Sequence, residues 1–365
     1  ALCSANLPIS DDIDPAQTND DFPQKNFNVV AYDGTQTADT AITVGFKPDL
    51  IWTKIRVASD SRLVDSTRGS TKYLVSNKND AEGTSSTGVT SFTSTGYVLG
   101  ADQLYNGVEA GVGPYTYVAW CWRANGGTTS SNTQGDVTST VQANQAAGFS
   151  IVKFTGTLGE SASTASVGHG LTAIPDLILS KSYDTGSKDW TVLHSGLTSR
   201  NYKLTLNTNA AEEDRSSAGN MASLFTTTTY GTNATTGLNQ SGRNYVAYVW
   251  HSVEGYSKFG KYVGNGNTDG PFIYLGFRPR MVFIKKTSSA NWYVLDTARD
   301  TFNPVTTLLS WDSSTSESDI GSANKFDVLS NGLKIRTSGN GLNGSNGTFV
   351  YGAWADVPFK YNNTF

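Results

Sequence analysis

The sequence predicts an all-β fold of three tandem β-sandwich modules, jelly-roll-like in character, that follow an extended N-terminal arm. Three observations lead to this prediction. Charged residues make up only 16% of the 365 residues, and Ser, Thr and Asn supply the polar surface instead. Two short signatures each occur three times. The segments between them alternate apolar and polar residues and are separated by turn residues, a pattern typical of short strands.

The first signature is a proline that opens an apolar strand. It reads GFKPDLIWTK at 45–54, returns with IPDLILSK at 174–181, and returns again as GFRPRMVFIK at 276–285. The second signature closes each copy and reads YVAWCW at 117–122, YVAYVW at 245–250 and FVYGAW at 349–354. The proline recurs after 127 and then 104 residues, and the valine of the second signature after 128 and then 104. Because two independent markers keep one register, the chain contains three copies of one unit.

Further strands are expected between these markers. Matching segments lie at 28–32 and 150–154, then at 63–66, 190–195 and 292–297, and then at 73–77, 203–207 and 307–310. Hairpins are expected at 92–99 and 326–335, with Gly96 and the pair Asn331-Gly332 at turns that need a positive φ. Each copy therefore holds about six short strands, and two packed sheets would cover the apolar face of each strand.

The markers also predict the domain boundaries. The proline-containing, acidic segment 1–26 is expected to be an extended arm, and 125–147, rich in Gly, Ser, Thr and Asn, is expected to be a linker. The modules are expected at 27–124, 148–260 and 261–360, followed by a short tail at 361–365. The tight junction at 254–260 predicts that the second and third modules pack against each other.

Bulk properties exclude several kinds of partner. A net charge of −4 with only 27 basic residues provides no patch for phosphates, so nucleic acid is not expected as a partner. No segment approaches the ~20 apolar residues of a membrane-spanning helix, so no membrane insertion is expected. Cys3 and Cys121 lie far apart and predict neither a disulfide framework nor a metal site.

Little in the sequence points to catalysis. His169, His194 and His251 fall at non-equivalent places and are interpreted as ordinary histidines. No G-x-S-x-G motif is present, and the acidic pairs at 11–12, 20–21 and 212–213 are expected in solvated turns. The glycine- and asparagine-rich segment 263–270 lacks the acidic count and the closing Glu of a calcium loop, so a turn is expected there. We therefore predict no catalytic, metal or cofactor-binding residues and no cofactor.

The aromatic residues have two interpretations. Aromatic side chains in a β scaffold can form the core, or they can stack on sugar rings. The residues in the repeated strands are expected in the core, namely Trp120, Trp122, Trp250 and Trp354. The better candidates for contact with a glycan or a neighbouring subunit are three tyrosines expected in loops, Tyr105, Tyr115 and Tyr230.

The three closing strings, the junction SVEGYSKFG at 252–260 and the segment NGNTDGPF at 265–272 resemble a family of tailed-bacteriophage virion proteins. The family is common in marine and cyanobacterial phages, and the resemblance covers nearly everything from Phe27 to Lys360. Its members are usually described as tail or tail-fibre proteins, and they carry no agreed catalytic residues.

The resemblance implies a structural virion protein, a tail-fibre or spike component that attaches the particle to the host surface. It also implies an extracellular location on the virion, at the tail or particle surface, and a homo-oligomer, with a trimer favoured. The implied partners are other virion proteins and a glycan or protein receptor on the host. Two alternatives stay open, a polysaccharide-degrading tailspike enzyme and a lectin-like adhesin that decorates the capsid surface.

Overall fold

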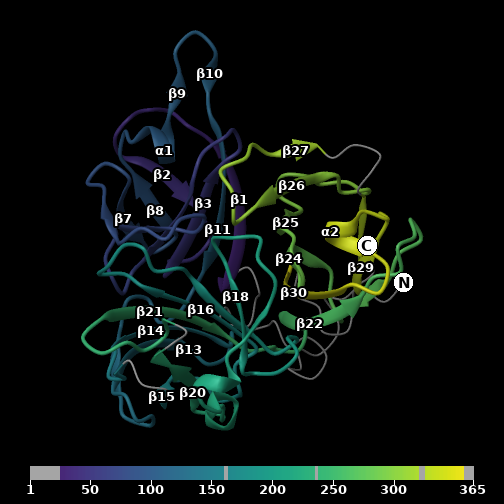
Figure 1. Cartoon of the computed structure of the whole chain (residues 1–365). Coiled ribbons are helices and arrows are strands. Elements are labelled where there is room, and N and C mark those ends of the chain that lie inside the picture. Colours follow the sequence, from purple (N-terminus) through teal and green to yellow (C-terminus); the bar gives the residue numbers. More distant parts are fainter. Residues whose placement is uncertain (1–24, 160–162, 235–236, 320–324, 357–365) are drawn as a thin grey trace, which may run out of the picture.

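The fold is all-β, as predicted. The computed structural model describes residues 25–159, 163–234, 237–319 and 325–356, and within them it has thirty strands and a few helices of three or four residues. Every pair of neighbouring strands within a sheet is antiparallel. The expected tail and all but the last two residues of the expected arm lie outside the described residues. Figure 1 shows three lobes, one for each expected copy.

The first lobe is built on a six-stranded sheet. Its strands follow the order β1-β11-β3-β4-β5-β6. Their bounds are Phe27–Asp33 (β1), Thr116–Trp122 (β11), Leu50–Ile55 (β3), Ser61–Asp65 (β4), Lys72–Val75 (β5) and Gly83–Thr84 (β6). The opening strand therefore lies beside the closing strand, and the proline-led strand lies on the other side of the closing strand.

The other two lobes repeat this order. The second sheet runs β14-β21-β16-β17-β18-β19, with β13 and β12 added beside β14, and the third runs β22-β30-β24-β25-β26-β27. The second set comprises Phe149–Thr155 (β14), Asn244–Trp250 (β21), Leu177–Ser182 (β16), Thr191–His194 (β17), Tyr202–Thr205 (β18), Glu213–Asp214 (β19), Ser139–Asn144 (β13) and Ser130–Asn132 (β12). The third comprises Ser257–Val263 (β22), Thr348–Ala355 (β30), Pro279–Lys286 (β24), Trp292–Asp296 (β25), Thr307–Ser310 (β26) and Ser318–Asp319 (β27). We call the three lobes units 1, 2 and 3.

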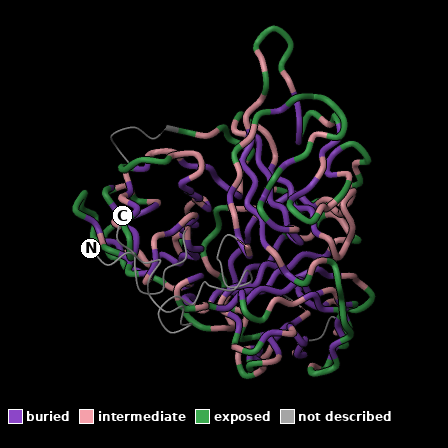
Figure 2. The backbone as a smooth tube through the Cα atoms, turned by 180° about the vertical axis from the view of Figure 1, so that it is seen from behind, coloured by how far each residue is buried: buried purple, intermediate pink, exposed green. Residues whose placement is uncertain are grey.

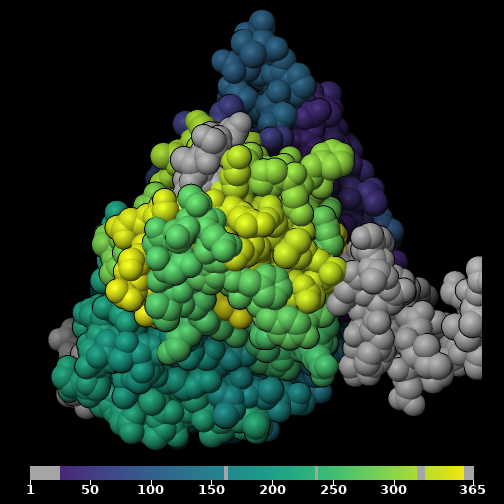
Figure 3. All heavy atoms as spheres, turned by 90° about the vertical axis from the view of Figure 1, so that its right-hand side faces the viewer, coloured from purple at the N-terminus to yellow at the C-terminus, as the bar shows by residue number. Residues whose placement is uncertain are grey.

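Each unit also has a small sheet. These are β2-β8-β7 in unit 1, β15-β20 in unit 2 and β23-β29-β28 in unit 3. Their bounds are Thr40–Thr43 (β2), Gly96–Leu99 (β8), Val89–Thr93 (β7), Thr164–Gly168 (β15), Thr229–Asn233 (β20), Phe272–Tyr274 (β23), Gly332–Ile335 (β29) and Phe326–Leu329 (β28). The remaining elements are Gln103–Asn106 (α1), Asn340–Asn343 (α2), Ser216–Ala218 (η3), Met221–Leu224 (η4) and the hairpin of Val108–Glu109 (β9) and Gly113–Pro114 (β10). This hairpin projects from unit 1 (Figure 3).

Each unit is a sandwich with its own core. The small sheet of every unit contributes to a separate apolar cluster together with one face of the large sheet. Alternate residues of the proline-led strand point to this face, as Ile51 does in β3 and Ile178 does in β16. The expected hairpins at 92–99 and 326–335 are present as β7–β8 and β28–β29.

The other faces of the three large sheets share one central core. A single cluster contains Leu50 and Trp52 of β3 together with Leu177 of β16 and Met281 of β24. The large sheets are therefore covered on both faces in their middle, and the proline-led strands β3 and β16 are buried at every residue, whereas the edge strands β1 and β22 are partly exposed (Figure 2). At one point of this core the closing tryptophans Trp122, Trp250 and Trp354 form a triangle, with ring centroids 5.3, 5.7 and 6.0 Å apart.

The units are joined in a closed ring by equivalent backbone hydrogen bonds. The residue before β6, β19 or β27 donates its N–H to the residue that follows the proline-led strand of the next unit. The bonds are Glu82 N to Tyr183 O at 2.8 Å, Glu212 N to Thr287 O at 2.6 Å and Glu317 N to Arg56 O at 2.7 Å. Because unit 1 binds unit 2, unit 2 binds unit 3 and unit 3 binds unit 1, the arrangement is a pseudo-threefold ring within one chain.

Buried polar side chains also make contacts across the same three seams. The hydroxyl of Tyr248 in unit 2 donates to Asp65 in unit 1 at 2.8 Å, and the indole N–H of Trp120 in unit 1 donates to Asp296 in unit 3 at 3.1 Å. At the third seam the ring of His194 in unit 2 lies 3.1 Å from the carbonyl oxygen of Tyr351 in unit 3. Each buried carboxylate also pairs with an arginine three residues later in the chain.

Three details differ from the sequence-based expectations. The expected linker 125–147 contains β12 and β13, which extend the sheet of unit 2. The boundary expected between residues 260 and 261 falls inside β22, so the third unit begins at Ser257. Gly96 and Gly332 do not need a positive φ. A Cβ at these positions would lie 1.9 and 2.2 Å from the carbonyl oxygens of Ile42 and Ile273 on the neighbouring strand, and this close approach requires glycine.

Candidate functional site

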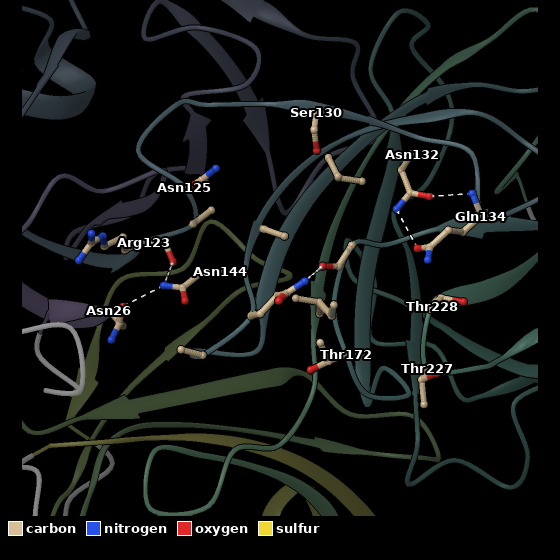
Figure 4. A pocket seen from close by; sticks show the side chains of 17 residues that line it. Asn26, Arg123, Asn125, Ser130, Asn132, Gln134, Asn144, Thr172, Thr227 and Thr228 are labelled. Atoms are coloured by element: carbon tan, nitrogen blue, oxygen red, sulfur yellow. Dashed lines mark hydrogen bonds between the residues drawn. The ribbon is translucent and has the colours of Figure 1, made fainter. Parts of the chain in front are cut away.

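Departures from the pseudo-threefold arrangement point to parts of the molecule that the scaffold does not need. The β12–β13 hairpin is the largest departure, since units 1 and 3 have no counterpart among the described residues. It lies beside the end of unit 1 and forms one wall of a groove of about 860 Å³. Figure 4 shows the side chains that line this groove.

Amide and hydroxyl side chains dominate the groove, which we call the amide groove. Its amides are Asn26, Asn125, Asn132, Gln134, Asn144 and Gln145, and its hydroxyls are Ser130, Thr172, Thr227 and Thr228. The apolar residues Val141, Ala143 and Leu171 also line it. Among the described residues that line the groove, Arg123 is the sole charged one, and none is Asp or Glu.

Buried polar residues hold the unit 1 side of the groove. The carboxylate of Asp49 accepts hydrogen bonds from Ala124 N at 2.7 Å and Gly126 N at 2.9 Å. The buried amide of Gln142 on β13 accepts a bond from Gly127 N at 2.7 Å. Burial raises the pKa of Asp49, although its hydrogen bonds oppose that shift. The loop that presents Asn125 is therefore fixed from both units.

A second set of hydrogen bonds holds the hairpin side. Asn144 donates its amide to the side-chain oxygen of Asn26 at 2.9 Å, and its own side-chain oxygen accepts a bond from Ala147 N at 3.0 Å. Asn132 accepts a bond from Gln134 N at 2.9 Å, as Figure 4 shows. Donors and acceptors are thus held in place along the groove. This chemistry suits a neutral ligand with many hydroxyl groups, since an amide offers both a donor and an acceptor.

The three histidines are buried structural residues. Gly196 N donates to Nδ1 of His194 at 2.9 Å and Leu171 N donates to Nδ1 of His169 at 3.1 Å, so each ring carries its proton on Nε2. Burial lowers the pKa of both rings to about 4, so both are neutral at pH 7. His251 is also buried, with Nδ1 2.9 Å from the carbonyl oxygen of Ser252. The structure brings none of the three together with the amide groove.

The acidic candidates are separate from the groove as well. Glu213 pairs with Arg215 at 2.7 Å, and Glu212 accepts a hydrogen bond from Thr198 N at 3.0 Å. The pairs at 11–12 and 20–21 lie outside the described residues. The segment 263–270 forms the expected turn, in which Asn267 N donates to the side chain of Asn265 at 3.0 Å. Within the described ranges, no group of three or more His, Cys, Asp or Glu residues is placed to hold a metal ion.

The aromatic predictions were right for the core and wrong for two of the loop positions. Trp120, Trp122, Trp250 and Trp354 are fully buried. Tyr105 and Tyr230 are also buried, since each belongs to the core of its own unit, and neither can stack on a ligand. Tyr115 is half-buried. The exposed large aromatic residues in the described part of the chain include Phe272, Tyr274 and Phe302.

Sequence reasoning missed the amide groove because it interpreted 125–147 as a linker. A signal was present, since Val137, Ser139, Val141 and Ala143 alternate along the segment with the period of a strand. The longer interval between the first and second copies, 127 against 104 residues, also indicated extra structure. Neither observation could show that the hairpin meets the end of unit 1, because that contact depends on how the units pack.

Comparison with known proteins places the chain in a family. A family model described as a domain of unknown function (DUF7483) matches residues 22–358. The chain belongs to this family. The match spans all three units, so the family is defined over the whole ring. No curated protein and no solved structure matches the chain. In the described ranges, no helix is both long enough and apolar enough to span a membrane.

Proposed function

We propose that this protein is a structural component of a tailed-phage virion, in a tail fibre or spike, and that it takes part in attachment to the host surface. The observation that carries the proposal is the closed ring of three equivalent units. The buried seams between all three units make the ring a rigid block. A particle component that is exposed to the extracellular environment requires such rigidity. The expected partners are neighbouring virion proteins and a receptor on the host.

The amide groove supports an attachment role. Fixed amides and hydroxyls can exchange hydrogen bonds with sugar hydroxyls, and the apolar residues Val141, Ala143 and Leu171 can lie against the C–H faces of a sugar. A receptor glycan of the host surface is therefore the ligand we propose for this groove. The same chemistry would serve a lectin-like adhesin on the capsid surface, which is the second candidate.

The first test is made on the particle. A phage that lacks this protein should assemble with a defective tail or should adsorb to host cells at least tenfold more slowly. Antibody-labelled particles imaged by electron microscopy should carry the label at the tail. A label over the capsid would support the decoration protein instead. Normal adsorption together with normal assembly would refute the proposal.

The second test is made on the purified chain. Binding to host surface polysaccharide should be weakened at least tenfold by Asn125→Ala combined with Gln145→Ala, because both amides line the groove. Asn79→Ala is the matched control, since Asn79 is exposed and lies outside the groove. New reducing ends during incubation with the polysaccharide would support the alternative of a polysaccharide-degrading tailspike.

The copy number is decided by a mass measurement. The resemblance to phage virion proteins implies a homotrimer, whereas the ring already brings three equivalent units together in one chain. Light scattering on the purified protein separates a species near 39.0 kDa from one three times larger.

A further inference from the structure

Strand β23 of unit 3 carries two aromatic residues where the equivalent strand of unit 1 carries small ones. The register is set by the glycine that starts the neighbouring strand, since Tyr274 pairs with Gly332 and Thr43 pairs with Gly96. Phe272 therefore corresponds to Ala41, and Tyr274 corresponds to Thr43. Because unit 1 builds the same sheet from Ala and Thr, the fold does not require aromatic rings at these two positions.

The two rings lie on the outer face of the sheet. Phe272 is 43% exposed and Tyr274 is 60% exposed, while Ile273 between them is buried in the core. Side chains two residues apart on a strand point to one face and are spaced by about 6.8 Å. Phe272 and Tyr274 thus form a short aromatic ledge on the surface of unit 3.

The ring of Phe272 lies against the neighbouring strand. A Cβ on Gly332 would lie only 2.8 Å from Cζ of Phe272, so this ring lies against a residue that has no side chain. The ring of Tyr274 lies near the ammonium group of Lys258, with Nζ 5.1 Å from the ring centroid. The same Nζ donates a hydrogen bond to the carbonyl oxygen of Tyr274 at 2.9 Å. Both rings of the ledge therefore contact neighbouring residues of the protein.

A pocket of about 370 Å³ adjoins the ledge. It is lined by Tyr274, by the carboxylate-bearing Glu254, by Lys258 and by the backbone of the junction at Gly255. Glu254 is exposed. The pocket thus combines an aromatic ring with a charged acceptor and a charged donor. One sugar ring could place its C–H face on Tyr274 and its hydroxyls on Glu254 and Lys258.

The equivalent strand of unit 2 is covered by the chain itself. Val137 forms a parallel bridge with Val167 of β15, and Asp136 accepts a hydrogen bond from Ser166 N at 2.8 Å. Ser166 is the counterpart of Phe272 and Ala41. The three units therefore differ at this strand. It is covered in unit 2, exposed with small residues in unit 1, and exposed with aromatic residues in unit 3.

We propose that the β23 ledge and its pocket form a carbohydrate-binding site, separate from the amide groove, for a neutral sugar chain. A sugar fits better than a protein partner because the ledge is two rings long and its neighbours are charged, including Lys334 opposite Phe272. A stable protein interface needs on the order of 1,000 Å² with an apolar centre. The site does not depend on the virion assignment or on the groove.

The test uses the full-length chain in affinity electrophoresis. The gels contain dextran, galactomannan or hydroxyethylcellulose as neutral polysaccharide probes, and a glycan array extends the set. The wild-type chain should be retarded in at least one gel or should bind at least one array glycan. Phe272→Ala combined with Tyr274→Thr, which introduces the residues of unit 1, should weaken that binding at least tenfold. Glu254→Gln should weaken it by a smaller factor.

Two controls make the result specific. The unfolding midpoint of the Phe272→Ala/Tyr274→Thr variant should stay close to that of the wild-type chain, because unit 1 folds with the same pair. The amide-groove variant Asn125→Ala/Gln145→Ala should be retarded in the gel as much as the wild-type chain. The ledge proposal and the groove proposal can therefore fail independently of each other.

Three outcomes would overturn the proposal. The first is no binding of the wild-type chain to any probe. The second is equal binding by the ledge variant. The third is binding to host envelopes that is lost after protease treatment, survives periodate oxidation and requires Phe272 and Tyr274, which would identify a protein partner instead.

Discussion

The hydrogen bond between Trp120 and Asp296 provides a direct test of the seam between units 1 and 3. Trp120→Phe removes the indole N–H that donates to Oδ2 of Asp296 at 3.1 Å and leaves the ion pair between Asp296 and Arg299 at 2.7 Å. Trp52→Phe is the matched control. Trp52 lies in the same central core, and its Nε1 has no hydrogen-bond partner in the described part of the chain.

The size of the expected loss of stability follows from the charge of the acceptor, Asp296. A buried hydrogen bond to a charged group contributes about 1.5–3 kcal/mol. Both substitutions replace an indole with a phenyl ring in one apolar cluster, so their packing losses are similar. The Trp120→Phe chain should therefore be less stable than the Trp52→Phe chain by about 1.5–3 kcal/mol. In combination with Asp296→Asn the two effects should not be additive, because the partners are in direct contact.

Calorimetry adds a test of the ring itself. Unfolding entropy is about 2.1 cal/mol/K per residue, so cooperative unfolding of the whole chain gives roughly 0.8 kcal/mol/K. The difference of about 1.5–3 kcal/mol then lowers the Tm of one shared transition by roughly 2–4 °C. Independent unfolding of a unit with a third of the residues would instead give a shift of roughly 6–12 °C in part of the trace.

Two results would refute this reasoning. Equal free energies of unfolding for Trp120→Phe and Trp52→Phe, measured by guanidinium denaturation and far-UV circular dichroism, would show that the seam bond contributes nothing. Separate calorimetric transitions for the three units would show that the shared core does not couple them.

The remaining predictions concern the pH dependence of the free energy of unfolding. Lys54, Lys181 and Lys285 occupy equivalent buried positions, and burial lowers the pKa of each to about 8. Since the unfolded chain keeps these protons to about pH 10.4, it binds more protons than the folded chain above pH 8, and the free energy of unfolding should rise between pH 8 and 10. Lys181→Met should remove about a third of that rise in denaturation curves, and an unchanged slope would contradict the burial argument. At acid pH, His169 and His194 have folded pKa values of about 4, below the unfolded value of about 6.5. The free energy of unfolding should therefore fall as the pH drops from 6.5 to 4. His194→Gln should reduce that loss by up to about 3 kcal/mol. If the free energy of unfolding depends on acid pH in the same way in both chains, His194 is not held neutral.

Much of the fold could be predicted from local pattern. The strands at the two repeated signatures and the hairpins at 92–99 and 326–335 follow from alternation and turn residues, because these features depend on neighbours in the chain. The equivalence of the three copies also lies in the sequence, since the proline and valine markers keep one register. The residues of the ledge can also be aligned between copies, since AIT at 41–43 corresponds to FIY at 272–274.

What the sequence could not decide was the exposure of individual residues. Tyr105 and Tyr230 look like loop aromatics in the sequence, yet both are buried because their segments fold onto the core of a unit. Phe272, Ile273 and Tyr274 are all apolar or aromatic, so the sequence does not show that Ile273 is buried while Phe272 and Tyr274 lie on the surface. The side of a sheet that is covered depends on the element packed against it, and that element is often distant in the chain.

The sequence by itself determined an all-β chain with a threefold repeat and short strands. Only the tertiary structure decided that the large sheets pack on both faces, that the three closing tryptophans contact one another in the shared core, and that the segment 125–147 builds a groove against unit 1. The physical reason is that strands and turns arise from short-range preferences, whereas the shared core, the seams and the groove arise from contacts between units, which no local pattern specifies.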